Sequence, residues 1–265
     1  MQPLRLTTLD DPRLEPYRCL KDTNLTRWAE QFVVEGEKLV QRLLASRHHV
    51  ISVVVDERSY PRLPRPIAPG IDVIILPDGV IPSLVGFNFH RGMLACARRP
   101  AITVLEDLFM LERRQETLVV CPQLDDPENF GALLRISAAF GAGGLVVGQR
   151  CPDQYSRRVL RVSMGAALTM PVWRSADLAR DLAELRQQSF ELIATVLDPA
   201  AERLQTAKRS GRLALVLGSE GHGLDPAWIA ACDRRVTIGM QPGVDSLNVS
   251  VAAAIFLYHF TRGGF

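Results

Sequence analysis

Three short segments in the second half of the chain combine polar side chains with glycines, as a site for a nucleotide-like ligand requires. The first contains Asn129, Gly131 and Arg135. Asp126 followed by Pro127 predicts a helix N-terminus. Helical spacing then puts Gly131 and Arg135 on one face near the positive end of that helix. A glycine beside an arginine leaves room for a phosphate or a ribose, although a capped helix with a surface arginine would show the same spacing.

The second segment has three glycines in the six residues 218–223, which frees its backbone to approach a flat ligand. Its order, G-x-x-G-x-G, is neither the G-x-G-x-x-G of dinucleotide-binding proteins nor the G-x-S-x-G of hydrolases. His222 is a side chain here that could act as an acid or a base. A lone histidine in a loop is most often only solvated, and we favour that interpretation of His222.

The third segment, residues 238–255, begins at a strand end and continues through a Pro-Gly loop into an apolar helix rich in small residues. Such a helix is expected to be buried. Ser246 and Asn248 stand at its beginning, and burying polar groups there is costly unless they find partners. They serve either as local caps or as contacts to a ligand.

Alternating strands and helices are predicted to position these segments from residue 117 onward. The strands are expected at Leu118–Cys121, Gly144–Gly148, Glu191–Val196, Leu213–Gly218 and Arg235–Met240, and the helices at Phe130–Phe140, Ala176–Gln188, Pro226–Cys232 and Leu247–Phe260. Short, unalternating apolar strands are typical of a parallel sheet covered by helices on both faces. Ligands of such sheets bind beyond the carboxyl ends of the strands, where all three segments fall.

The first part of the chain has a different pattern, which predicts a separate domain over residues 1–98 and a linker over 99–116. A helix is expected at Glu37–Ser46, and strands are expected at Val50–Val55 and Val73–Leu76. The second domain would then span residues 117–265.

Composition narrows the class of protein. The chain has 265 residues, 47% of them hydrophobic and 23% charged, which is typical of soluble globular proteins. No apolar run is long enough for a membrane helix, and the N-terminus lacks a secretory signal, so we expect a cytoplasmic protein.

The five cysteines are scattered without a C-x-x-C pair, so neither a metal site nor a disulfide framework is expected. Arginine supplies 28 of the 31 basic residues, which suits phosphate contacts but also fits a GC-rich genome.

Taken together, the three segments resemble the signature motifs of the SpoU, or TrmH-like, RNA 2′-O-ribose methyltransferases of the SPOUT class. The matching residues are Asn129, Gly131, Arg135, Phe140 and Gly141, then Gly218, Glu220, Gly223 and Leu224, then Ile238, Met240, Ser246, Leu247, Asn248 and Val249. Residues 161–166 resemble the family's R-x-S-x-G stretch, and residues 32–37 resemble the start of its substrate-binding domain. One departure is Gly239, where the family usually has proline.

The resemblance implies an α/β fold whose parallel sheet ends in a C-terminal trefoil knot, preceded by a small α/β RNA-binding domain. It implies S-adenosyl-L-methionine as cofactor and a homodimer formed through the knotted domain. The implied cofactor-binding residues are Leu217, Gly218, Glu220, Ile238, Met240, Ser246 and Leu247.

The implied reaction is methylation of a ribose 2′-hydroxyl in structured RNA, with ribosomal RNA the first expectation and transfer RNA the second. Arg135 would contact the target nucleotide, and Asn129 would position Arg135 or the ribose. Glu220, Ser246 and Asn248 would orient the loops and the nucleotide. Arginine is a poor general base because it stays protonated, so a role in stabilising developing negative charge fits better.

The N-terminal domain resembles kink-turn-binding ribosomal proteins, which implies capture of structured RNA by shape. Candidate phosphate contacts are Arg42, Arg47, Arg58, Arg62 and Arg65. Two other interpretations remain open. One is an RNA-binding protein of the same fold without catalysis. The other is a nucleotide-dependent enzyme of another class, such as a dehydrogenase. Against it, this chain lacks the G-x-G-x-x-G motif that dinucleotide-binding enzymes carry after their first strand.

Overall fold

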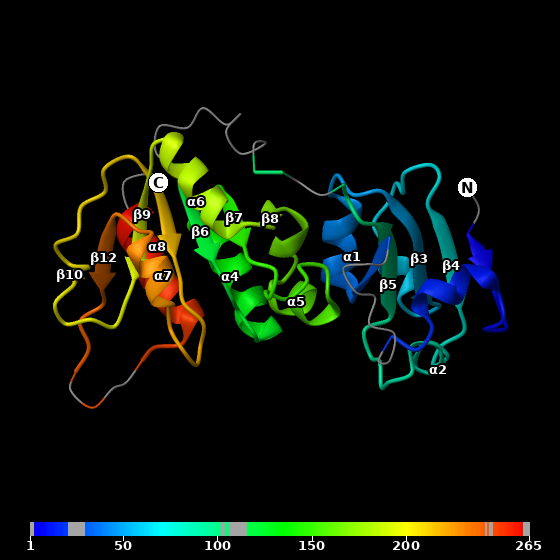
Figure 1. Ribbon diagram of the computed structural model, residues 1–265. Coiled ribbons are helices and arrows are strands. Elements are labelled where there is room, and N and C mark those ends of the chain that lie inside the picture. Colours follow the sequence, from blue (N-terminus) through cyan, green and yellow to red (C-terminus); the bar gives the residue numbers. More distant parts are fainter. Residues whose placement is uncertain are drawn as a thin grey trace. The chain divides into compact units, whose positions relative to one another are not determined.

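The chain forms two compact units in the computed structural model, which describes residues 3–20, 30–101, 104–105, 116–241, 243 and 246–261 (Figure 1). One unit comprises Met1–Ala101 and Asp153–Thr169, and the other comprises Ile102–Pro152 and Met170–Phe265. Residues 153–169 therefore belong by compactness to the first unit, although they lie inside the second in sequence. Much of the predicted linker, residues 102–103 and 106–115, lies outside the described residues. The boundaries 1–98 and 117–265 remain a prediction about functional domains.

The first unit is built on a mixed five-stranded sheet in the order β1-β4-β3-β5-β2. Its strands are β1 (Leu4–Arg5), β2 (Gln31–Glu35), β3 (Val50–Asp56), β4 (Asp72–Leu76) and β5 (Met93–Arg98), and its helices are α1 (Glu37–Leu44), α2 (Ile81–Val85) and α5 (Arg157–Val162), with short 3-10 turns at Pro12–Tyr17, Tyr60–Arg62 and Ala166–Leu168. β5 runs antiparallel to both neighbours, whereas β1, β4 and β3 are parallel.

Ion pairs hold the segment 153–169 against the first sheet. The guanidinium of Arg99 donates to both carboxylate oxygens of Asp153 at 2.9 and 2.6 Å, and both side chains are largely buried. Arg157 pairs with Glu35 at the end of β2. A bidentate arginine–carboxylate pair constrains the relative orientation of its two side chains. The Arg99–Asp153 pair therefore fixes where the segment attaches to the sheet.

Aromatic packing completes this attachment. The rings of Phe32 and Tyr155 lie 4.5 Å apart, and His48 contacts both of them edge-on. His48 also bonds through its Nε2 to the carbonyl of Leu168 at 3.0 Å. Gly165, in the R-x-S-x-G stretch, has φ +86°, and a Cβ there would lie 2.9 Å from the side chain of Arg42. This stretch is therefore a packing element of the first unit.

The second unit is built on a seven-stranded sheet in the order β10-β12-β9-β11-β6-β7-β8, in which every pairing is parallel. Its strands are β6 (Thr117–Cys121), β7 (Gly144–Val147), β8 (Val172–Arg174), β9 (Phe190–Thr195), β10 (Glu202–Arg203), β11 (Arg212–Val216) and β12 (Arg234–Thr237), and its described helices are α4 (Pro127–Ala139), α6 (Leu178–Gln187), α7 (Pro226–Ala230) and α8 (Val249–Thr261). The parallel α/β sheet predicted from the sequence is confirmed.

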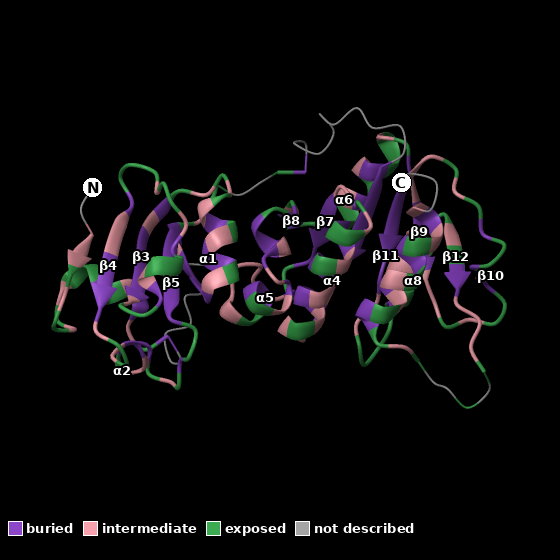
Figure 2. Cartoon of the chain, turned by 180° about the vertical axis from the view of Figure 1, so that it is seen from behind, coloured by how far each residue is buried: buried purple, intermediate pink, exposed green. Residues whose placement is uncertain are grey.

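The sheet of the second unit is buried while its helices keep exposed outer faces (Figure 2). Every residue of β6 and β7 is buried, as their continuous apolar sequences predict. α4 packs against α8. Among the described residues, no helix combines the length and apolar character needed to cross a membrane, and no group of three His, Cys, Asp or Glu side chains could hold a metal ion.

Candidate cofactor and RNA site

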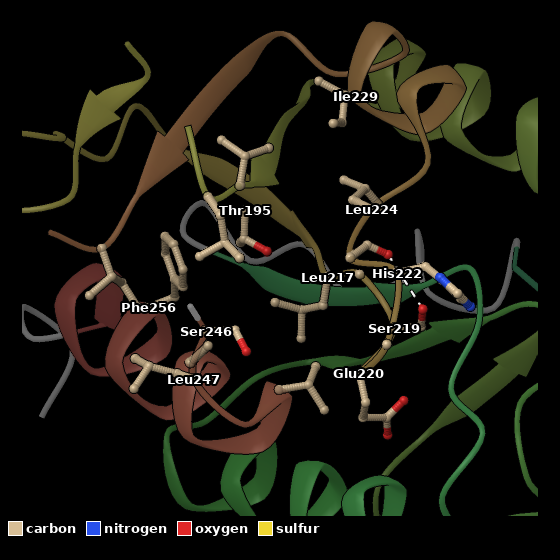
Figure 3. A pocket seen from close by; sticks show the side chains of 18 of the residues that line it. Thr195, Leu217, Ser219, Glu220, His222, Leu224, Ile229, Ser246, Leu247 and Phe256 are labelled. Atoms are coloured by element: carbon tan, nitrogen blue, oxygen red, sulfur yellow. Dashed lines mark hydrogen bonds between the residues drawn. The ribbon is translucent and has the colours of Figure 1, made fainter. Parts of the chain in front are cut away.

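A cavity of about 500 Å³ lies beyond the carboxyl ends of β9 and β11, beside the start of α8 (Figure 3). We refer to it as the first cavity. The residues that the sequence assigned to a cofactor all line it: Leu217, Gly218, Glu220, Ile238, Met240, Ser246 and Leu247. They come from two loops that are separate in sequence, one after β11 and one after β12, and the parallel sheet brings these loops to the same edge.

The loop that follows β11, residues 218–224, forms one wall of the first cavity, and we call it the glycine loop. The amide of Ser219 donates to the carbonyl of Gly223 at 2.9 Å, and the amide of Gly223 donates back to Ser219 at 3.1 Å. A Cβ on Gly218 would lie 2.2 Å from the carbonyl carbon of Gly223. Glycine at position 218 therefore permits a backbone approach that no side chain would allow.

A chain of hydrogen bonds, which we call the amide relay, joins all three sequence motifs. The Nδ2 of Asn248 donates to the Oδ1 of Asn129 at 2.8 Å, and the Nδ2 of Asn129 donates to Glu220 at 2.8 Å. The Oδ1 of Asn248 accepts from the amide of Ser250 at 2.9 Å and from its hydroxyl at 2.6 Å. Because a backbone amide can only donate, it fixes the orientation of Asn248 and hence the direction of the whole relay.

The relay also explains how α8 begins. The Oδ1 of Asn248 accepts from the amides of Ser250 and, at 3.4 Å, Val251, so Asn248 caps the helix. From the sequence, both Ser246 and Asn248 were possible caps, and the described hydrogen bonds assign this role to Asn248. Ser246 is exposed and lines the first cavity instead. Asn248 thus serves as both of the alternatives left open, a helix cap and part of the candidate site.

Arg135 lies apart from the relay. It is exposed on α4, and it makes no hydrogen bond or ion pair with the described residues. Arg135 is six residues beyond Asn129, which at about 100° per residue puts the two side chains roughly 120° apart around the helix. Asn129 therefore does not orient Arg135 by direct contact in this structure. The predicted helix start is confirmed, since Asp126 accepts from the amide of Glu128 at 2.9 Å.

Gly239, the departure from the family pattern, lies against an arginine. A Cβ at this position would lie 2.4 Å from Nη1 of Arg203, the last residue of β10. β10 pairs in parallel with β12, and this pairing brings Arg203 beside the loop that follows β12. The guanidinium of Arg203 occupies the space that the usual proline ring would need.

Several lining residues of the first cavity were not singled out in the sequence. They are Thr195, Val196 and Leu197 after β9, Ser219 and Gly221 in the glycine loop, Ile229 in α7, and Ala252 and Phe256 in α8. The rule that ligands bind beyond strand carboxyl ends points to residues 195–197, because a strand was predicted to end at Val196. For α8 the spacing of 249, 252 and 256 marks one helical face, but an apolar face is equally typical of core.

The thiols near the strand ends stay protonated. Burial raises the pKa of Cys121 well above its ordinary value, and it raises the pKa of Cys151 to about 11. A thiol acts as a nucleophile only as thiolate. Neither cysteine is therefore set up for covalent catalysis.

The first cavity suits an adenosine-containing sulfonium compound. Leu217, Ile238, Met240 and Phe256 offer apolar surface for a flat base, while Glu220 and Ser246 offer polar atoms at the rim. The volume falls in the range of about 300–1,000 Å³ that is usual for small-molecule sites.

Comparisons with known proteins agree with this geometry. The model of the SpoU rRNA Methylase family matches residues 116–258. An uncharacterized tRNA/rRNA methyltransferase of Mycobacterium bovis is 35% identical over 264 residues, covering 96% of this chain and 90% of the relative. The 23S rRNA (guanosine-2′-O-)-methyltransferase RlmB of Acinetobacter baylyi is 33% identical over 196 residues, covering 73% and 79%. The AdoMet-bound rRNA methyltransferase from Sinorhizobium meliloti shares the fold, with a TM-score of 0.84 at 22% identity and complete coverage of both chains.

Proposed function

The chain belongs to the SpoU rRNA methylase family, and from that premise we propose that it transfers a methyl group from S-adenosylmethionine to a ribose 2′-hydroxyl of ribosomal RNA. Transfer RNA is the second candidate substrate. The observation that carries this proposal is the first cavity, which residues of the second and third motifs line and to which the amide relay joins Asn129 of the first motif. The intact amide relay argues against a fold that has kept RNA binding and lost catalysis.

The residues proposed to hold the cofactor are Leu217, Gly218, Glu220, Ile238, Met240, Ser246 and Leu247. When bound, S-adenosylmethionine supplies a methyl group already activated by its sulfonium centre. The protein then has to align the ribose and manage one proton. Leu217 and the glycine loop form a fixed wall for this purpose, because Gly218 and Gly223 lock that loop onto itself.

Arg135 is proposed to bind the target nucleotide and to stabilise negative charge as the 2′-oxygen attacks. Its exposure and its lack of a partner among the described residues leave its guanidinium available to an RNA phosphate. It does not abstract the proton, because arginine remains protonated in proteins. Asn129, Glu220 and Asn248 hold the three motifs together through the relay, and Ser246 faces the ligand.

A trefoil knot and a homodimer complete the proposal. Family membership supports both proposals, and an apolar stripe on α8 supports the dimer. Val251, Ile255 and Tyr258 are 47%, 38% and 53% exposed, and their spacing of four and three residues puts them on one side of the helix. A second copy of the chain would cover this stripe. A crystal structure in which the C-terminal segment after β12 does not thread through a preceding loop of the second unit would refute the knot.

The dimer is tested by Ile255→Asp, which puts a charge into the stripe. We expect light scattering coupled to gel filtration to give a mass near twice 29.4 kDa for the natural protein and half of that for the variant. Ala183→Asp, at an exposed position of α6, serves as the control. An unchanged mass for Ile255→Asp would remove this stripe from the interface.

The first unit is proposed to capture RNA, and the whole protein to act in the cytoplasm, where ribosomal RNA is found in bacteria such as those of its relatives. Arg42, Arg47, Arg58, Arg62 and Arg65 remain the candidate phosphate contacts. Two of them are partly engaged within the protein, because Arg62 pairs with Glu37 at 3.0 Å and Arg65 stacks on Tyr60. Exposed Arg42, Arg47 and Arg58 are the better candidates.

The central experiment compares Arg135→Ala with the natural protein in two assays. We expect isothermal titration to give nearly the same affinity for S-adenosylmethionine, while methyl transfer to ribosomal RNA from a strain lacking this gene falls at least 100-fold, about 2.7 kcal/mol of transition-state stabilisation. Arg180→Ala, an exposed arginine on α6, should leave both unchanged. If the natural protein failed to bind the cofactor, the non-catalytic interpretation would replace this proposal.

A further inference from the structure

A second cavity, of about 840 Å³, lies at the same edge of the parallel sheet as the first. Its lining comes from the segments that follow β6, β7 and β8, namely 122–123, 148–150 and 175–179, and from residues 217–219, 222–226 and 228. The first cavity lies by β9 and β11, whereas the second lies across β11, β6, β7 and β8. Both therefore occupy the region where doubly covered parallel sheets bind ligands.

The second cavity has a rigid base. A Cβ on Gly148 would lie 2.0 Å from the carbonyl oxygen of Pro122, so the loops after β6 and β7 touch through a position that only glycine can fill. Beside it, the guanidinium of Arg174 donates to four carbonyls, those of Gly148, Gln149, Cys151 and Pro152, at 2.6–3.3 Å. A loop held in this way presents its outward side chains without needing to be ordered by the ligand.

The polar groups of this cavity are a mixture of donors and acceptors. Arg150 is exposed and has no hydrogen-bond or ion-pair partner among the described residues. Ser175 is 5% exposed, and its hydroxyl is buried with no partner in the described part of the chain. Gln123 and Gln149 add amides. An unpaired buried hydroxyl in a cavity wall is the kind of group that a ligand satisfies.

The acidic groups decide against a phosphate as the occupant. Asp177 and Asp225, the N-caps of α6 and α7, both line the cavity. Each uses one carboxylate oxygen to cap its helix, at 3.1 and 2.8 Å, and their negative charge would repel an anion. A flat, neutral group that both donates and accepts hydrogen bonds fits this lining better, and the ring of Trp228 is available beside it. Unstacked RNA bases have this chemistry.

The glycine loop separates the two cavities. Leu217–Ser219 and His222–Leu224 line both of them. We propose that the second cavity receives an unstacked nucleobase of the RNA substrate, next to the cofactor cavity. This inference rests on the proposed function. It gives exposed His222 a place at the boundary between cofactor and RNA, and it assigns the recognition of a base to Gln123, Gln149, Arg150 and Ser175.

The test fills the second cavity without touching the first. Ala179→Trp puts a large ring into the cavity from α6, and Ala183→Trp adds the same ring one turn further along the helix, outside the lining. Binding of the four nucleoside 5′-monophosphates is measured by saturation-transfer NMR with S-adenosylhomocysteine present in excess to block the first cavity. Arg150→Ala and Arg180→Ala form a second matched pair, each removing one exposed positive charge.

We expect at least one nucleotide to bind the natural protein, with its signal coming mainly from base protons. Binding should be lost in Ala179→Trp, weakened about tenfold in Arg150→Ala, and unchanged in both controls. Equal binding to Ala179→Trp and Ala183→Trp, or no binding of any nucleotide to the natural protein, would overturn the inference. Failure of S-adenosylhomocysteine to bind in a parallel titration would instead count against the proposed function. The two failures are therefore distinguishable.

Discussion

At the scale of single residues, the amide relay shows how three weak motifs become one site. Asn129, Glu220 and Asn248 are each ambiguous in sequence, where a cap or a solvated side chain would look the same. Their hydrogen bonds span 91 and 119 residues of sequence. Sequence spacing indicates only which residues a few positions apart share a helix or strand face. The sequence therefore predicted these three residues as candidates, but it did not predict that they bond to one another. The amide of Ser250, which sets the direction of the relay, carries no sequence signal at all.

Removing the central amide of the relay should separate its two ends. Asn129→Ala leaves Glu220 and Asn248 without their shared partner, and we expect kcat/KM for RNA methylation to fall about tenfold, roughly 1.4 kcal/mol. Cofactor affinity should change little, because Asn129 does not line the first cavity. Single-turnover assays and titration calorimetry measure the two effects. The control is Gln187→Ala, an exposed amide at the end of α6. A variant with natural turnover would reduce the relay to a packing feature.

At the scale of elements, the glycine loop is the part on which both cavities depend. The sequence predicted the strand before it and the freedom of its backbone, because three glycines follow an apolar run. The sequence did not show that Gly218 is required for packing whereas Gly221 is not. That distinction depends on the contact between positions 218 and 223, which forms only when the loop folds back on itself.

Two alanine substitutions in this loop should behave differently. In Gly218→Ala the new methyl group meets the backbone of Gly223 at 2.2 Å, so the loop must move. A Cβ on Gly221 would meet no atom within 4 Å, so Gly221→Ala should be tolerated. We expect calorimetry to show S-adenosylmethionine affinity at least tenfold weaker for the first variant and within about twofold of natural for the second. Similar affinities for both would mean that the loop adapts without cost.

Element prediction missed two regular strands of the first unit, β2 and β5, and several short elements. The strands β6, β7, β9, β11 and β12 and the helices α4, α6, α7 and α8 all lie where apolar runs and helical periodicity predicted them. β8 has only three residues and α5 only six, and neither is long enough to show a period. The sequence between β7 and β8 therefore could not reveal that it belongs to the other unit.

At the scale of the whole molecule, Arg209 joins the beginning of the second unit to its end. Its guanidinium donates to the carbonyl of Glu116 and the hydroxyl of Thr117 at the start of β6, and to the carbonyl of Phe260 near the end of α8. Burial lowers the pKa of Arg209. Only a planar group with several donors can reach all three acceptors at once.

Arg209→Ala should therefore destabilise the protein by about 1.5–3 kcal/mol. Arg209→Lys should recover little of this loss, because one ammonium cannot span the acceptors. Thermal unfolding followed by circular dichroism measures the change in Tm. For a unit of this size, Tm should fall by about 2–4 °C per kcal/mol of lost stability. Arg180→Ala is the surface control. Full recovery by lysine would show that charge alone matters at this position.

The inserted segment 153–169 bears on how such a protein can be cut and recombined. Because the chain passes between the units at residues 101–102, 152–153 and 169–170, neither unit is a single stretch of gene. A hybrid that joins residues 1–98 of one homologue to 117–265 of another takes Phe32, Glu35 and His48 from one parent and Tyr155 and Arg157 from the other. Substrate recognition and methyl transfer can then be exchanged between relatives only when these contact residues match. Successful crossovers should be concentrated among homologues that share both sides of this attachment.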